Sequence, residues 1–309
     1  MKRMASFLLC MLLLACGVQT PAADVQPKPT PEPTQTEEPV EIVAFHTQAP
    51  QATDTPAATE AATEVPTPES TPEPTPEPER IDAARLDAGE FDSFFDDAVF
   101  VGDSITKSFR NYVTEKREAD GRCLGEAKFL GVINMSALRA AKDRINDDGI
   151  NFFYRGSAKP FSEAVRATEA KKVLILFGVN DLVWCRWDDE TRAFERLIEL
   201  VRSVEPDAEI VIQALLPVTK RYCSRNEIEI GTWNSYNDVL REMCEKNGVT
   251  FLSFAEKLMD DDGYLNETYS SDGQYHLNGQ GNEIWIRALR EYAARRMYPD
   301  AVLVIQGGD

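Results

Sequence analysis

The sequence predicts an α/β fold: a parallel sheet between two layers of helices, that is, a three-layer α/β/α sandwich. Two observations lead to this prediction. Short, almost entirely apolar runs recur between residues 98 and 258, and amphipathic stretches separate them. Strands that are apolar on both faces are typical of parallel sheets, whose crossover connections are helices. The segment 80–309 has a length that suits one domain of this kind.

Each strand is expected where an apolar run stands between turn residues. The most apolar run is 171–181, KKVLILFGVND. In chain order, the expected strands are 98–105, 127–134, 171–181, 208–218 and the beginning of 249–258. We expect them to form a parallel, flavodoxin-like sheet, in which ligands bind beyond the carboxyl ends of the strands.

The expected helices show apolar residues at helical spacing. They are 106–116, 188–206, 233–248 and 281–296. In the second of these, Asp188 or Asp189 is expected to cap the start, and Pro206 to end the helix. Gly248 is expected to stop the third.

The chain begins with a segment typical of an export signal. Residues 1–20 have a basic start followed by an apolar run of about a dozen residues, which is too short to span a bilayer. The run ends in Leu13-Leu14-Ala15-Cys16, which resembles a bacterial lipobox. The resemblance implies a lipoprotein anchored by a lipid on Cys16 and facing outward from the bacterial cell membrane. The alternative is an ordinary secretory signal with an incidental cysteine.

Residues 21–79 predict a disordered stalk. They hold 14 of the 18 prolines, together with many Thr, Glu and Ala residues, and offer little apolar area to bury. The stalk carries 12 acidic residues and one lysine, which leaves about 40 acids against 30 bases in the folded part 80–309. An acidic surface argues against nucleic acid as a partner, because phosphate binding needs clustered Lys and Arg.

Polar residues follow the expected strands where a parallel sheet binds ligands. Gly102-Asp103-Ser104 follows the first strand, Asn134-Met135-Ser136 the second and Gly178-Val179-Asn180-Asp181 the third. A serine at a helix start is more often a cap than a nucleophile, and as a nucleophile it needs a base. The chain has two histidines, and His46 lies in the expected stalk. The remaining candidate base is His276, with Asp272 close before it.

In their order and spacing, these blocks resemble the SGNH hydrolases, also called the GDSL-like lipase/esterase family. The resemblance spans about 95–297 and implies a serine esterase that needs no cofactor or metal. It implies that Ser104 is the nucleophile, His276 the base and Asp272 its orienting partner. It further implies an oxyanion site made by the backbone N–H of Ser104, the side chain of Asn180 and the backbone N–H of Ser136.

The sequence departs from the family pattern at two positions. Ser136 stands where the family usually has glycine. Three residues, rather than two, separate Asp272 from His276. Because of these departures, a catalytically weak or inactive carbohydrate-binding scaffold stays open as an alternative, as does an acyltransferase. An α/β-hydrolase is disfavoured, since no second glycine follows Ser104 as in Gly-x-Ser-x-Gly.

Two further expectations concern the loops at the same sheet edge. If the third and fourth strands are neighbours, a disulfide between Cys185 and Cys223 is plausible. The aromatic residues of these loops, Trp184, Trp187, Tyr222 and Trp233, either line a sugar-binding cleft or pack under the loops. The exported location and these aromatic residues favour a small ester or an acetylated polysaccharide as the substrate.

Overall fold

A computed structural model describes residues 78–304. The expected signal peptide, the anchor at Cys16 and nearly all of the expected stalk lie outside the described residues. Within the part that is described, no helix combines the length and the apolar character needed to cross a membrane.

The centre of the molecule is a five-stranded sheet in which all neighbouring strands are parallel. Its strands lie in the order β3-β2-β6-β7-β8. They span Lys128–Gly131, Ala98–Gly102, Lys172–Leu176, Glu209–Gln213 and Thr250–Leu252, respectively. The chain starts in the second position, steps to one edge and then continues to the other, which is the flavodoxin-like order. The predicted fold class is therefore confirmed.

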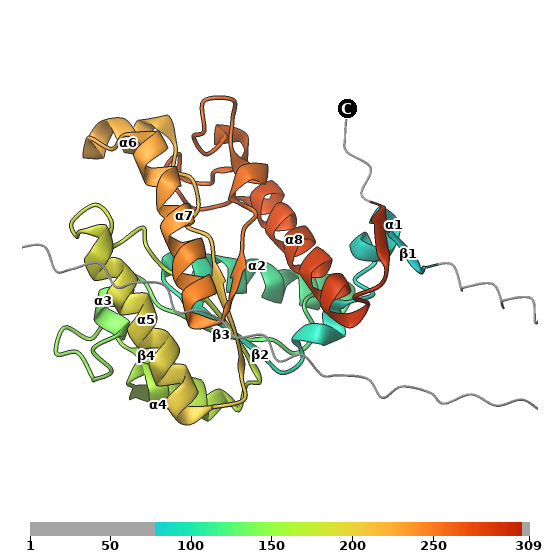
Figure 1. The fold of residues 1–309 in the computed structure, drawn as a ribbon, viewed down its shortest axis with the longest axis horizontal. Helices are drawn as coiled ribbons and strands as arrows, with labels where there is room; N and C mark the ends of the chain where they lie inside the picture. The colour runs from blue at the N-terminus through green and yellow to red at the C-terminus, as the bar shows by residue number, and fades with distance from the viewer. Residues whose placement is uncertain (1–77, 305–309) are drawn as a thin grey trace, which may run out of the picture. The chain divides into compact units, whose positions relative to one another are not determined.

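Helices cover this sheet in two groups (Figure 1). In one group α5 (Trp187–Val204) packs against α3 (Ala137–Ala140), α4 (Phe161–Thr168) and α7 (Ile230–Asn247). In the other group α2 (Ser104–Asp120) packs against α8 (Gly279–Met297). The predicted strands and long helices all occur, with shifted ends.

The expected cap of α5 was wrong. The helix begins at Trp187, and its N-cap is Arg186, which makes no side-chain capping bond. Asp188 and Asp189 lie inside the first turn, where acidic side chains favour the positive end of the helix dipole.

Several short elements escaped the sequence analysis. A hairpin joins β4 (Phe152–Tyr154) to β5 (Ser157–Lys159). At the ends of the described chain, β1 (Arg80–Asp82) pairs with β9 (Val302–Val304). The helical ones are α1 (Ala83–Asp87), α3, α4, α6 (Lys220–Asn226) and the 3₁₀ turns Asp92–Phe95, Ala255–Leu258 and Glu267–Tyr269.

Close packing fixes the point where β2 turns into α2. A Cβ atom on Gly102 would lie 2.1 Å from the Thr106 hydroxyl and 2.5 Å from the Leu176 carbonyl oxygen. Both distances are shorter than any van der Waals contact, so the position requires glycine. The chain can therefore turn sharply beside β6, and the residue after Asp103 lies at the carboxyl edge of the sheet.

Candidate active site

Ser104 is the first residue of α2, but it does not cap the helix. The cap is the buried Asp103, whose Oδ1 accepts a hydrogen bond from the backbone N–H of Ile105 at 2.8 Å. Burial raises the pKa of Asp103 to about 7, against the opposing effect of that hydrogen bond. Because Asp103 takes the capping role, the Ser104 hydroxyl is left to interact with another part of the chain.

That other part is His276, which lies 172 positions later. Its Nε2 is 2.9 Å from the Ser104 hydroxyl oxygen, and its Nδ1 is 2.7 Å from Oδ2 of Asp272. The structure thus brings these three predicted residues into one hydrogen-bonded chain. In this chain the carboxylate holds one ring nitrogen, and the other ring nitrogen faces the hydroxyl.

The turn that carries His276 explains how an extra residue fits between it and Asp272. Oδ1 of Asp272 accepts hydrogen bonds from three successive backbone N–H groups, at Gln274, Tyr275 and His276. Gly273 has φ +67°, a conformation that favours glycine. One carboxylate oxygen therefore closes the turn and the other reaches the imidazole. Burial opposes ionisation of Asp272, but hydrogen bonds from His276 and Gln274 keep its pKa below the usual value.

Aromatic side chains pack against this turn. The ring of Tyr275 lies 4.6 Å from that of His276 and edge-on to Tyr222 at 5.1 Å, and Tyr222 meets Trp233 edge-on at 6.4 Å. Tyr222 and Trp233 are buried, so of the two roles considered for them they have the packing role. Trp184, by contrast, is 86% exposed.

Asn180 follows β6, the neighbour of β2, and its side chain reaches the loop after β3. Its Nδ2 donates to the carbonyl oxygen of Met135 at 2.8 Å. A second contact, with Oδ2 of Asp103, is long at 3.5 Å. One amide hydrogen of Asn180 is therefore donated to the loop, and the other makes only a weak hydrogen bond.

Ser136 is placed differently from Asn180. Its hydroxyl caps α3 by accepting a hydrogen bond from the Arg139 N–H at 3.2 Å. It also lowers the pKa of the neighbouring Asp181. Ser136 is not among the residues that line the hollow around Ser104.

The serine and the imidazole open into a hollow with a volume of about 400 Å³. Polar side chains form most of its wall. It is lined by Ser104, Lys107, Ser108, Asn111, Ile133, Asn134, Ser271, Tyr275 and His276. The four residues from α2 stand at positions i, i+3, i+4 and i+7, so one face of the helix forms a wall. Their spacing is visible in the sequence and indicates a shared helix face next to Ser104, but this wall was not among the predictions.

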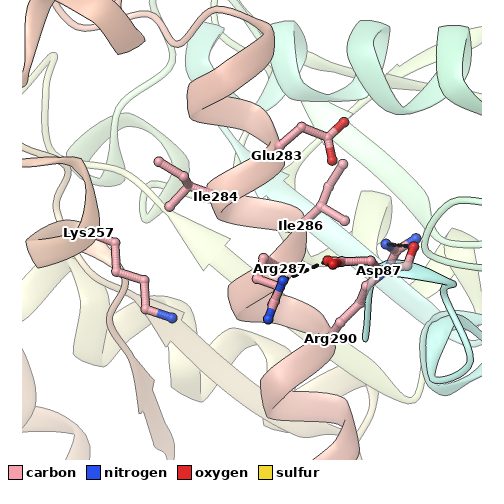
Figure 2. A pocket seen from close by; sticks show the side chains of 7 residues that line it. All are labelled: Asp87, Lys257, Glu283, Ile284, Ile286, Arg287 and Arg290. Carbon is pink, nitrogen blue, oxygen red and sulfur yellow. Dashed lines mark hydrogen bonds and ion pairs between the residues drawn. The ribbon is translucent and has the colours of Figure 1, made fainter. Parts of the chain in front are cut away.

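A second hollow lies along α8, lined also by Asp87 and Lys257, as Figure 2 shows. Its charged side chains are already paired: Arg287 with Asp87 at 2.7 Å, and Lys257 with Glu291 at 2.8 Å. None of the side chains that line it is a Ser, Cys or His. This hollow therefore offers no serine nucleophile with a base beside it, unlike the one around Ser104. Within residues 78–304, no cluster of His, Cys, Asp or Glu could hold a metal ion.

The disulfide expected between Cys185 and Cys223 is not formed, although β6 and β7 are neighbours as that expectation required. Both residues are free thiols. Cys223 is buried on α6, whereas the Cys185 sulfur lies 4.0 Å from Oε2 of Glu190. The two side chains are thus engaged with different surroundings.

Comparisons with known proteins indicate the family and the fold. Residues 100–284, more than half of the chain, match the GDSL-like Lipase/Acylhydrolase family. A candidate acylhydrolase from Bacteroides fragilis shares the fold with a TM-score of 0.51 and 16% identity, over 65% of this chain and 87% of that one. For a GDSL-like lipase from Bacteroides thetaiotaomicron, the TM-score is 0.50 and the identity 17%, over 64% and 88%. None of the curated proteins matches the chain.

Proposed function

Because the chain belongs to the GDSL-like lipase/acylhydrolase family, we propose that it is a serine esterase that removes short acyl groups, above all O-acetyl groups of polysaccharides. One observation carries the proposal: the hydrogen-bonded chain Asp272–His276–Ser104 opens into a polar hollow. The longer spacing before His276, which favours a non-catalytic scaffold at the level of sequence, does not separate the imidazole from the carboxylate.

Acylation begins at the Ser104 hydroxyl. Its oxygen attacks the ester carbonyl carbon while His276 Nε2 takes the proton. The negative charge that develops on the carbonyl oxygen is stabilised by the backbone N–H groups of Ser104 and Ser136 and by the weakly engaged hydrogen of Asn180 Nδ2. Asp272 holds the imidazole through Nδ1 and stabilises the imidazolium.

The intermediate collapses when the bond to the alcohol oxygen breaks. The leaving alkoxide takes the proton from His276, and the acyl group remains on Ser104 as an ester. Water then attacks this acyl-enzyme, gives one proton to His276 and forms a second tetrahedral intermediate. Its collapse releases the carboxylic acid and returns the proton to the Ser104 oxygen.

The wall of the hollow supports a hydrophilic substrate. Apart from Ser104 and His276, five of its seven lining side chains are polar or charged, and the exceptions are Ile133 and Tyr275. A long acyl chain needs an apolar channel, whereas sugar hydroxyls need hydrogen-bond donors and acceptors such as Ser108 and Asn111.

The test compares p-nitrophenyl acetate, p-nitrophenyl palmitate and an O-acetylated polysaccharide, with the full-length chain and its Ser104→Ala variant. We expect acetate release from the first and third substrates, and at least a ~10²-fold lower kcat/KM for palmitate because Ile133 and Tyr275 alone among the lining residues offer a large apolar side chain to a long acyl chain. Palmitate turnover equal to acetate turnover would overturn the substrate class but keep the esterase chemistry. Release that is equal in both proteins would overturn the esterase itself.

Replacing Asp272 with asparagine is expected to lower kcat by about 10²–10⁴. The amide oxygen can still accept the backbone hydrogen bonds of the turn, but no carboxylate then holds Nδ1 or stabilises the imidazolium. Steady-state kinetics with p-nitrophenyl acetate measure the effect. The control is Asp261→Asn, an exposed acid in another turn. A loss of less than about tenfold would mean that Asp272 does not orient the base.

A further inference from the structure

A group of carboxyl side chains is buried behind the loop that follows β3. Asp103, Asp181 and Glu190 are all buried, and Glu190 has no exposed area at all. The mechanism uses none of them directly. Buried carboxyl groups without a cation are costly unless they are protonated and hydrogen-bonded, so their presence calls for a specific role.

Asn180 and Asp181 form hydrogen bonds to two residues of the β3–α3 loop that lie on either side of Ser136. Asn180 donates to the Met135 carbonyl oxygen, and Oδ2 of Asp181 accepts from the Ala137 N–H, both at 2.8 Å. The Ser136 side chain lowers the pKa of Asp181. The backbone N–H of Ser136 lies between these two hydrogen-bonded positions, Met135 and Ala137. The direction of this N–H therefore depends on the position of Asp181.

Glu190, from the first turn of α5, is the neighbour of Asp181. Each carboxyl group shifts the pKa of the other, and a hydrogen bond between two carboxyl groups requires that one of them carries a proton. No N–H or O–H group in the described part of the chain donates to Oε1 of Glu190. A proton on Glu190 would turn this carboxyl from an unsatisfied acceptor into a donor to Asp181.

We propose that Glu190 and Asp181 share one proton and that this pair is a positioning unit, which fixes the Ser136 N–H for the oxyanion. The inference rests on the proposed function, because it assigns a purpose to the loop in ester hydrolysis. Glu190 touches no reacting atom and acts through Asp181 and the loop. Glu190 lies in the first turn of α5, and α5 packs against α3, the helix that follows the loop.

The surroundings of Glu190 keep it neutral. Burial, then the charge of Asp181 and its hydrogen bond, raise the pKa of Glu190 to about 10, and burial also raises the pKa of Asp181. The other titratable groups that face the pair are Asp103 from β2–α2, Cys185 from the preceding loop and Tyr236 from α7. All of them are acids, so none can supply a positive charge to Glu190.

The activity test uses Glu190→Ala and Glu190→Gln in the full-length chain. The glutamine keeps a donor for Asp181, so its kcat should stay within about threefold of wild type. The alanine should lower kcat by about 10²-fold with KM within threefold, as for loss of one oxyanion donor. Glu199→Gln, an exposed glutamate of the same helix, is the control. Equal losses in both Glu190 variants, or no loss in the alanine variant, would overturn the proposal.

The shared proton has its own readout, which does not require activity. At about pH 9, Asp103 should be ionised whereas Glu190 should still be protonated. An infrared band of a protonated carboxyl group should therefore be present in wild type and absent in Glu190→Gln. Identical spectra would overturn the shared proton, and a missing band in wild type would do the same.

The pH dependence of stability gives a second measurement that distinguishes the two proposals. The folded-state pKa of Glu190 lies above its ordinary value of 4.5, so the folded protein binds more protons than the unfolded one between about pH 4.5 and 10. Stability must then fall with rising pH across this window, and Glu190→Gln should lack that part of the fall. If wild type has no esterase activity but both readouts hold, the proposed function fails and the proton pair stands.

Discussion

Replacing Ser104 with alanine is expected to lower kcat for p-nitrophenyl acetate by about 10⁴–10⁶. The variant removes the atom that forms the acyl-enzyme and leaves the imidazole without a nucleophile to activate. Donors that bind the oxyanion remain, so a small rate above that of free water should persist. Steady-state kinetics measure the loss, and a fluorophosphonate probe reports independently whether residue 104 is the reacting atom.

Ser93→Ala is the matched control, because Ser93 is an exposed serine of the same domain. It should keep wild-type kinetics and full labelling by the probe. A Ser104→Ala protein that still reacts with the probe, or still hydrolyses the ester at more than about a hundredth of the wild-type rate, would rule out Ser104 as the nucleophile.

The second large effect is expected for His276→Ala, with a fall in kcat of the same order as for Ser104→Ala. The Ser104 hydroxyl loses the Nε2 acceptor at 2.9 Å and becomes an ordinary, weak nucleophile. Because the two residues act as a unit, the double variant should be no slower than either single variant. Kinetics of the three proteins test this non-additivity.

The chain supplies its own control, since His46 is the only other histidine. His46→Ala should match wild type in every assay. Losses that multiply in the Ser104/His276 double variant would show that the two residues act independently, which contradicts a shared proton transfer.

Much of the fold could be predicted because parallel strands buried on both faces produce uninterrupted apolar runs. The run at 171–181 gave β6, and the helical pattern after it gave α5. Short elements lack such a signal. The β4–β5 hairpin turns through Arg155 and Gly156, both with positive φ, and arginine is not a residue that normally marks such a turn. Its existence depends on contacts that sequence periodicity does not report.

The residues at the strand ends could be proposed from the sequence, because a parallel sheet collects its carboxyl ends at one edge. The hydrogen bonding of the turn between Asp272 and His276 could not be predicted from the sequence. A spacing of three residues between Asp272 and His276 gives no indication that one carboxylate oxygen closes the turn while the other reaches the imidazole. Likewise, the first turn of α5 reads as an exposed acidic helix start, and only the tertiary packing of α5 against its neighbours buries Glu190.

The prediction of a disulfide between Cys185 and Cys223 was wrong for a physical reason. The reasoning placed both loops at the same edge of the sheet, which is correct. However, a disulfide needs Cα atoms within about 7 Å and Cβ atoms that face each other, and loop placement alone specifies neither. Cys223 lies in a short helix, α6, that the sequence analysis did not predict.

The pairing of β1 with β9 has a consequence for how the protein is made. Ile81, at the centre of β1, is completely buried, and its partner in the parallel pair is Leu303. During synthesis β1 therefore has no strand to pair with until β9, at Val302–Val304, has left the ribosome. The stretch that must emerge before this region can fold is thus longer at both ends than residues 100–284, where the chemistry resides.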